Sequence, residues 1–195
     1  TIVDLDGDRA WQDSKVLITD YVGQVINVGF LYTDGNQWNY GYCVDDFSVT
    51  EVTSAKDLVL TNVVFEDYVK NDEDYTINLS LVNNGYETVS SFDVSITGAD
   101  GNVATTTITP PSAIAFARSF SFDVSSSYNL TDTKKYDFSV AISNINGGAD
   151  EDMTNNSGDV SFTSVANPPV RKMVGEEATG TWCGFCPRGA VWMEY

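Results

Sequence analysis

The chain has 195 residues, of which 42% are hydrophobic, so it is long enough and apolar enough to form packed cores. It carries 28 acidic and 10 basic residues, and its net charge of −18 opposes binding to nucleic acid or to anionic lipid headgroups. It contains no histidine, which excludes Ser-His-Asp catalysis, Cys-His catalysis and zinc sites built on histidine.

The sequence shows no stretch long and apolar enough to cross a membrane, and no signal-peptide pattern. It lacks an initiator Met, begins within one folded unit and ends within another. We therefore expect a fragment of a longer protein, so that the missing signal says nothing about its compartment. The acidic surface favours solubility, and it also suits Ca²⁺, which prefers carboxylate and carbonyl oxygens.

The first block, residues 1–53, has the alternation of apolar and polar residues that is typical of β-strands. We predict strands at residues 15–19, 25–32, 38–44 and 47–52. One face of the second strand carries Ile26, Val28, Phe30 and Tyr32, at a period of two. Four strands are too few to close a sandwich, so we expect the rest of this unit to lie upstream.

Two sequences stand out in this block: Tyr21-Val22-Gly23-Gln24-Val25-Ile26-Asn27-Val28-Gly29-Phe30 and Val44-Asp45-Asp46-Phe47-Ser48-Val49. They resemble two strands in the C-terminal half of cleaved-adhesin (choice-of-anchor J) jelly-roll domains, and the likeness covers residues 11–53. The resemblance implies a partial jelly-roll-like β unit from a binding and adhesion family. That family often carries calcium and brings no catalytic residues.

The segment Asp4-Leu5-Asp6-Gly7-Asp8 has the composition of a calcium-binding loop. An EF-hand is rejected, because its sixth position must be Gly but is Arg9, and its twelfth must be Glu but is Lys15. A looser Ca²⁺ site of oxygen ligands stays open, drawn from Asp4, Asp6, Asp8 and Asp45. The alternative is a solvated turn, with Asp45 and Asp46 bonded to backbone N–H groups.

The second block predicts seven strands, which follow a short polar connection at residues 53–57. They span residues 58–65, 75–82, 92–98, 103–109, 114–124, 136–142 and 160–165. Three faces are apolar: Tyr75, Ile77, Leu79 and Leu81; Phe116, Phe120 and Phe122; and Tyr136, Phe138, Val140 and Ile142. Seven short alternating strands in about 110 residues fit an immunoglobulin-like β-sandwich over residues 58–165.

Two motifs lie in this second block: Leu79-Ser80-Leu81-Val82-Asn83-Asn84-Gly85 and Glu151-Asp152-Met153-Thr154-Asn155-Asn156-Ser157. They resemble segments of CARDB-type bacterial adhesion domains, the second of them just before the last strand. The resemblance implies a spacer or a ligand-presenting module, whose ligand would be a surface glycan or a protein. We expect the aromatic stripes to form core rather than a platform for sugars.

The last segment carries a cysteine pair. Residues 166–169, Ala-Asn-Pro-Pro, predict a compact linker that the two prolines stiffen. An extended stretch then leads to Trp182-Cys183-Gly184-Phe185-Cys186-Pro187, where a helix is predicted to begin. A helix N-terminus stabilises a Cys183 thiolate, and Cys186 lies within reach to resolve a mixed disulfide. Pro187 fits the first turn of a helix.

Residues 170–195 resemble the start of a thioredoxin-like domain, and most closely those of Bacteroidetes-type envelope lipoproteins. By that resemblance Cys183 is the attacking thiol, Cys186 is the resolving thiol, and Trp182 and Pro187 are their neighbours at the redox site. The segment departs from thioredoxin in having Phe185 rather than proline between the cysteines. The chain stops before the remaining strands of that family, so we expect this fragment alone to be inactive.

The third cysteine, Cys43, is predicted to be a small buried apolar residue. A zinc site would need Cys43, the cysteine pair and a carboxylate from another domain. We therefore reject a zinc site and keep the prediction that Cys43 is a buried apolar residue.

Two functions fit the sequence. The first is an extracytoplasmic thiol–disulfide oxidoreductase of a bacterial envelope, in the periplasm, outer membrane or cell surface. It acts on protein thiols and disulfides, requires no cofactor and uses its β modules as a stalk. The second is a non-enzymatic surface adhesion protein in which the cysteine pair forms a structural bridge. A glycosidase is the weakest hypothesis, because nothing marks out one pair among the 28 carboxylates.

Overall fold

The structure is a computed structural model, which describes residues 11, 13–36, 41–65, 68–73, 75–98, 101–126 and 130–167. The described part is almost entirely β, apart from a 3₁₀ turn, η1 (Thr19–Tyr21). Its eight strands are β1 (Leu58–Val64), β2 (Tyr68–Lys70), β3 (Tyr75–Asn83), β4 (Phe92–Gly98), β5 (Val103–Ile108), β6 (Ser119–Ser126), β7 (Lys135–Ser143) and β8 (Ser157–Val165).

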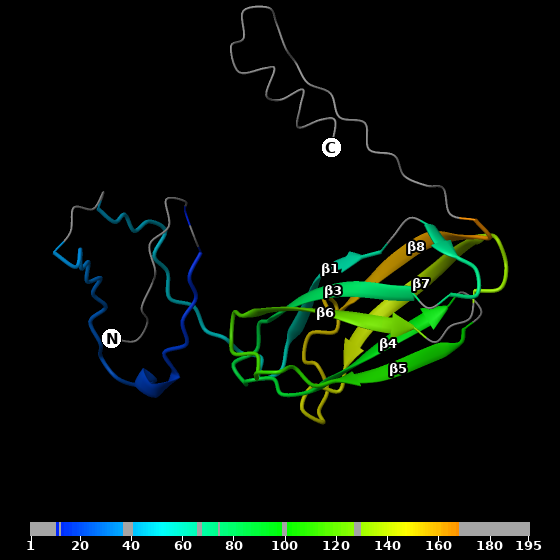
Figure 1. Ribbon diagram of the computed structural model, residues 1–195. Coiled ribbons are helices and arrows are strands. Elements are labelled where there is room, and N and C mark those ends of the chain that lie inside the picture. Colours follow the sequence, from blue (N-terminus) through cyan, green and yellow to red (C-terminus); the bar gives the residue numbers. More distant parts are fainter. Residues whose placement is uncertain are drawn as a thin grey trace, which may run out of the picture.

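The strands form two sheets that pack as two layers (Figure 1). One sheet has three strands in the order β1-β3-β6, and the other has five in the order β2-β8-β7-β4-β5. Every pairing is antiparallel except that of the short β2 with β8. The mainly β fold class and the predicted immunoglobulin-like β-sandwich are therefore confirmed.

The core lies between the sheets and follows the predicted alternation. Along β3, Tyr75, Ile77, Leu79 and Leu81 are buried, and the residues between them face outward. The same alternation buries Tyr136, Phe138, Val140 and Ile142 on β7. Each large apolar side chain removed from water in this way contributes about 1.5–3 kcal/mol, which is why the two apolar faces meet.

One end of the core is aromatic. The rings of Phe138 and Phe162 lie nearly parallel with centroids 5.3 Å apart, and the Phe65 ring lies 4.2 Å from that of Phe162. Tyr75, at the start of β3, contacts Phe65 and Phe162. These side chains come from both sheets and from the loop after β1, so they close this end of the sandwich.

The structure corrects three details of the predicted strands. The strand predicted at 114–124 begins only at Ser119, because Ala117 has a φ of 57° and lies in a turn. Phe116 therefore precedes β6 and does not share a strand with Phe120 and Phe122. The sequence also missed β2, whose three residues are too few to show a period of two.

The described residues before β1 contain no strand, although strands were predicted at 15–19, 25–32 and 47–52. Their apolar side chains stay exposed: Val25 is 101% and Leu31 is 89% exposed. The rings of Phe30 and Phe47 do meet, with centroids 5.6 Å apart. An alternating pattern becomes a strand only where a neighbouring strand supplies backbone partners, and the described residues offer none here. The jelly-roll-like unit at 1–53 stays a prediction.

The chain passes from one end of the sandwich to the other. It reaches β1 through residues 54–57, beside the loops that follow β3 and precede β8, and it leaves at Val165, at the aromatic end (Figure 1). No helix in the described part is long and apolar enough to cross a bilayer.

Candidate functional site

The two CARDB-like motifs meet at one end of the sandwich, around residues 54–57, which we call the strap. The loop at 83–87 follows β3 of the three-stranded sheet, and the loop at 150–156 precedes β8 of the five-stranded sheet. All four strap carbonyl groups accept hydrogen bonds from backbone N–H groups of these loops. The shortest of these bonds joins the Asn84 N–H to the Asp57 carbonyl oxygen at 2.8 Å, and the longest joins the Gly85 N–H to the same oxygen at 3.2 Å. The strap therefore ties the two sheets together.

Asp57 is the buried acid at the centre of this end, with only 3% of its surface exposed. Its carboxylate accepts hydrogen bonds from the side-chain amides of Asn84, at 2.8 Å, and Asn155, at 3.1 Å. One of these amides comes from each motif. Because a buried carboxylate is costly unless donors surround it, Asp57 explains why both motifs carry asparagine at these positions.

Asn83 is completely buried and holds the first loop in shape. Its side-chain amide donates to the carbonyl oxygens of Glu87, at 2.8 Å, and Ile114, at 2.9 Å, and its Oδ1 accepts from the Gly85 N–H at 3.0 Å. Asn156 plays the matching part in the second loop, since its amide donates to the Ile142 carbonyl at 3.0 Å. The motif residues thus satisfy backbone groups that no strand pairs.

Asp150 is a second buried acid beside the strap. Its carboxylate accepts the N–H groups of Leu58, at 3.2 Å, and Asp152, at 3.0 Å. Burial raises the pKa of Asp150, those two backbone hydrogen bonds lower it, and the negative charge of Asp57 raises it, so that the net pKa lies above its ordinary value. Both buried acids are occupied by protein donors, so the cluster is suited to holding loops rather than to catalysis.

Most of the predicted site residues lie outside the described part of the chain: Cys183, Cys186, Trp182, Pro187, Asp4, Asp6 and Asp8. Their roles stay predictions. Asp45 is described and exposed, and its Oδ1 accepts the Asp46 N–H at 2.9 Å; the choice between a Ca²⁺ site and a solvated turn also involves Asp4, Asp6 and Asp8 and stays a prediction. Within the described residues, no three His, Cys, Asp or Glu side chains are grouped to hold a metal ion.

Cys43 was predicted to be buried, and that prediction is wrong. Its side chain is a free, exposed thiol. The prediction relied on the general tendency of free cysteine to be buried; residues 41–44 are not a strand and are exposed, so no core covers the thiol.

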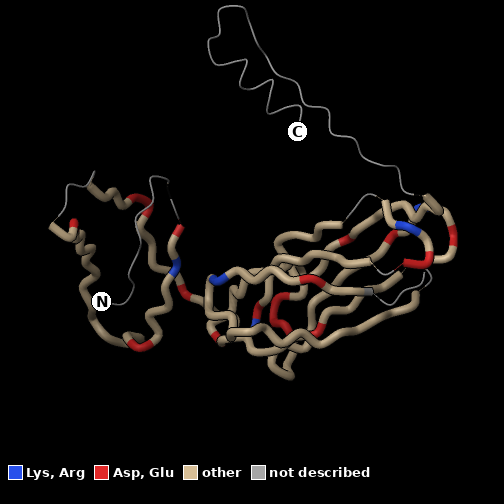
Figure 2. The backbone as a smooth tube through the Cα atoms, viewed as in Figure 1, with Lys and Arg blue, Asp and Glu red and all other residues tan. Residues whose placement is uncertain are grey.

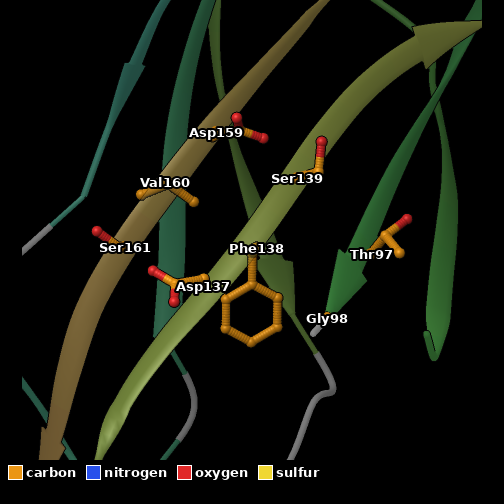
Figure 3. Close-up of a pocket in the computed structure, with 8 residues that line it drawn as sticks. All are labelled: Thr97, Gly98, Asp137, Phe138, Ser139, Asp159, Val160 and Ser161. Carbon is orange, nitrogen blue, oxygen red and sulfur yellow. The ribbon is translucent and has the colours of Figure 1, made fainter. Parts of the chain in front are cut away.

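The sequence did not reveal a shallow depression of about 470 Å³ over β4, β7 and β8 (Figure 3). Its polar groups are the hydroxyls of Thr97, Ser139 and Ser161 and the carboxylates of Asp137 and Asp159. Figure 3 shows Ser139 and Asp159, which are cross-strand neighbours, projecting in the same direction. Asp137 is paired with Lys135 at 2.9 Å. Hydroxyl and carboxylate groups are hydrogen-bond donors and acceptors, and only the strand pairing, which the sequence does not show, brings these together.

No protein-family model matches the chain, and no curated protein matches it. Among solved structures, the chain is similar to the CARDB domain of a Pyrococcus furiosus protein, solved in complex with di-metal ions, with 14% identity and a TM-score of 0.47. That match covers 60% of this chain and 100% of the other. A domain of a protein assigned to the cell surface of Methanosarcina acetivorans is 23% identical, with a TM-score of 0.44, over 57% of this chain and 94% of the other.

Red sea bream transglutaminase is also similar, at 16% identity and a TM-score of 0.39, over 56% of this chain and 15% of that protein. All three structures are less than 25% identical to this chain, so no ligand or activity is transferred from them.

The strap contact predicts a specific effect of Gly85→Ala. An added Cβ at Gly85 would lie 2.8 Å from the Asp57 backbone nitrogen and still closer to the Ala55 carbonyl, so the strap backbone would have to move. We expect a loss of about 1–3 kcal/mol in the free energy of unfolding, measured by urea denaturation. Gly148→Ala is the matched control, because its Cβ would meet only the flexible tip of Lys56. Equal losses in the two variants would contradict the strap's role.

The raised pKa of Asp150 predicts a pH dependence. A carboxyl group with a raised native pKa stabilises the fold fully below its unfolded pKa, and this stabilisation is lost as pH rises through the native pKa. The unfolding free energy of the natural sequence, relative to Asp150→Asn, should therefore increase as pH falls from 7 to about 4. Urea titrations of both proteins at several pH values measure it.

Asp93 supplies a control of opposite sign. Hydrogen bonds from Thr107 and Asn144 lower its pKa, so its contribution is present above the unfolded pKa and is lost as pH falls. Relative to Asp93→Asn, the natural sequence should lose stability below about pH 4. If both comparisons had the same sign, the assignment for Asp150 would be wrong.

Proposed function

We propose that this chain is an extracytoplasmic spacer of a bacterial envelope protein, whose β-sandwich separates an upstream adhesion-type β unit from a thioredoxin-like thiol–disulfide domain. The observation that carries the spacer role is the path of the chain, which reaches β1 at the strap end and leaves β8 at the aromatic end. β8 has nine residues, which at about 3.3 Å per residue separate the two junctions by about 30 Å.

The strap supports this role because a spacer needs a firm junction. Residues 54–57 bond through their backbone to loops of both sheets, and Lys56 lies 4.0 Å from Glu87. At the other end, the Val165 carbonyl accepts the Asn71 N–H at 3.0 Å. Both ends of the module are therefore held by the fold up to the residues that lead away from it.

The redox part of the proposal is supported by the sequence around Cys183 and Cys186. The Cys183 thiolate attacks one sulfur of a partner disulfide, forming a mixed disulfide and releasing the other partner sulfur as a thiolate. Cys186, as a thiolate, then attacks the Cys183 sulfur and displaces the second partner thiolate, which takes up a proton. The pair is oxidised by two electrons and the partner disulfide is reduced. No cofactor takes part, and the sequence offers no histidine for the proton transfers.

The redox proposal is tested in the natural protein that carries this chain, by alkylating Cys183 with iodoacetamide across a pH series. Because Cys43 is exposed and would also react, every protein in the series carries Cys43→Ser. We expect the Cys183 thiolate to form well below pH 8.5, the value typical of a free cysteine. The Cys186→Ser variant should then accumulate a mixed disulfide with a disulfide substrate.

An ordinary or raised Cys183 pKa, with no trapped mixed disulfide, would sink the redox proposal. It would favour the alternative, a non-enzymatic adhesion protein in which Cys183 and Cys186 form a structural bridge and the β modules bind a surface glycan or a protein.

The spacer role makes a separate prediction for small-angle X-ray scattering of the natural protein. The distance distribution should show an elongated particle, because the flanking units attach at opposite ends of the sandwich. Gly85→Ala, which displaces the strap, should broaden that distribution relative to Gly148→Ala. A compact particle in which the flanking units touch one another would contradict the spacer role.

A further inference from the structure

Among the residues that the structure describes, the sandwich has four edge strands, and three of them are protected against pairing with another chain. The edge β1 has a register shift between Leu60 and Asn62. The edge β2 has only three residues and carries Lys70. The edge β6 carries a carboxylate, Asp123, in its middle. A bulge, a very short strand and a charge are the devices by which β proteins prevent edge-to-edge association.

The fourth edge, β5, has none of these devices. Its sequence, Val-Ala-Thr-Thr-Thr-Ile, holds no charged residue and no proline, and it pairs with β4 in an unbroken register from Val103 to Ile108. Figure 1 places β5 at the outer margin of the five-stranded sheet, and Figure 2 shows no charged residue along it. An exposed, regular and neutral edge is a template for an added strand.

The alternation of hydrogen bonds along the β4–β5 pair shows which backbone groups of β5 are left to bond another strand. The Gly98 N–H donates to the Asn102 carbonyl at 2.9 Å, so in the alternating antiparallel ladder Ala104, Thr106 and Ile108 bond to β4. Val103, Thr105 and Thr107 therefore direct their N–H and C=O groups away from the sheet. Within the described part of the chain, none of those groups takes part in a backbone hydrogen bond outside the strand ladders.

Two of the three threonine hydroxyls on this edge already have partners. The Thr107 hydroxyl donates to Asp93 at 2.6 Å, and the Thr105 hydroxyl lies 3.1 Å from that of Ser95. What the edge offers a partner is thus its backbone, which recognises an extended strand rather than a small ligand.

We propose that β5 pairs with β5 of a second copy of this chain, antiparallel and centred on Thr105, so that the two five-stranded sheets become continuous. In this register Thr105 faces Thr105 of the other copy, and Val103 faces Thr107. Each of these outward-directed pairs exchanges two backbone hydrogen bonds. On the other face Ala104 meets Thr106. No charges are brought together, whereas β6 paired in the same way would bring two copies of Asp123 together.

The charge of the chain sets the strength of this contact and its response to salt. A six-residue edge forms an interface well below the roughly 1,200–2,000 Å² typical of stable complexes, and two copies of charge −18 repel each other. Association is therefore weak, and salt strengthens it by screening the repulsion. Salt would weaken the binding of a basic peptide to the same edge. The direction in which affinity changes with salt therefore distinguishes a second copy of this chain from a basic peptide.

The test is sedimentation of the whole chain, carrying Cys43→Ser and kept in a reductant so that Cys183 and Cys186 form no disulfide dimers, over a concentration series at about 20 mM and about 500 mM salt. We expect a monomer–dimer equilibrium whose dissociation constant falls at the higher salt concentration. Thr105→Pro should weaken it at least about tenfold, because proline removes an outward N–H and is tolerated on an edge strand. Ser121→Pro is the matched control, since Ser121 is an outward-directed position on β6.

A second variant separates a loss of strand pairing from a loss of folding. Thr105→Lys keeps the backbone N–H but sets two like charges opposite each other at the centre of the interface, and it should also abolish the dimer. Circular dichroism reports whether each variant is folded. A monomer at every concentration, a dimer unchanged by either Thr105 variant, or equal loss in Ser121→Pro would overturn the proposal. None of these outcomes bears on Cys183, so the redox proposal stands or falls separately.

Discussion

The hydrogen bonding of the strap is the constraint on which the rest of the structure depends. Where strands end, backbone N–H groups lose their ladder partners, and burying them unpaired costs free energy. The carbonyl groups of residues 54–57 supply acceptors to loops from both sheets at once. Asp57 and Asp150 add buried carboxylates, and Asn84 and Asn155 supply two of the donors that those carboxylates require. The segment before β1 is thus a structural part of the sandwich rather than a free linker.

The strap also gives the module a direction. Because the chain is bound at one end before β1 begins and leaves at the other end after β8, its two junctions lie at opposite ends of the sandwich, as the proposed spacer role requires. The aromatic cluster around Phe138 and Phe162 closes the far end with apolar packing, while the strap end is closed by polar bonding. Both ends of the sandwich are thus filled by structural contacts, and the redox chemistry that we propose is assigned to Cys183 and Cys186, outside the sandwich.

The outer faces show how an acidic, hydroxyl-rich sandwich limits what it offers to partners. Cross-strand hydroxyls bond one another, as Ser80 does with Ser121 at 2.8 Å. Acidic residues on the same faces are held by neighbours, as Asp123 is by the Asn78 amide at 2.8 Å. When side chains are satisfied in this way, the backbone of an unprotected edge becomes the most available group, and β5 is that edge.

The sequence by itself determined the sandwich. The alternation from Tyr75 to Leu81 and from Tyr136 to Ile142 indicated strands with one apolar face, because a period of two is a local property that survives in any fold that buries that face. It also located the motifs at 79–85 and 151–157. The same reasoning predicted strands before residue 57 that the described residues do not form, because alternation at 25–32 meets no neighbouring strand there. The burial predicted for Cys43 rested on residue type alone, and residue type does not determine which positions a core covers.

Only the tertiary structure decided that the two motifs meet, that Asp57 and Asp150 are buried beside them, and that Asp150 has a raised pKa. A sequence shows that residue 57 is polar, but burial and hydrogen-bond partners 27 and 98 positions away depend on how the sheets stack. The identity of the unpaired edge is likewise a property of strand order. Val103 to Ile108 reads as an ordinary strand, and it is an edge because no strand of the described chain follows it in the sheet.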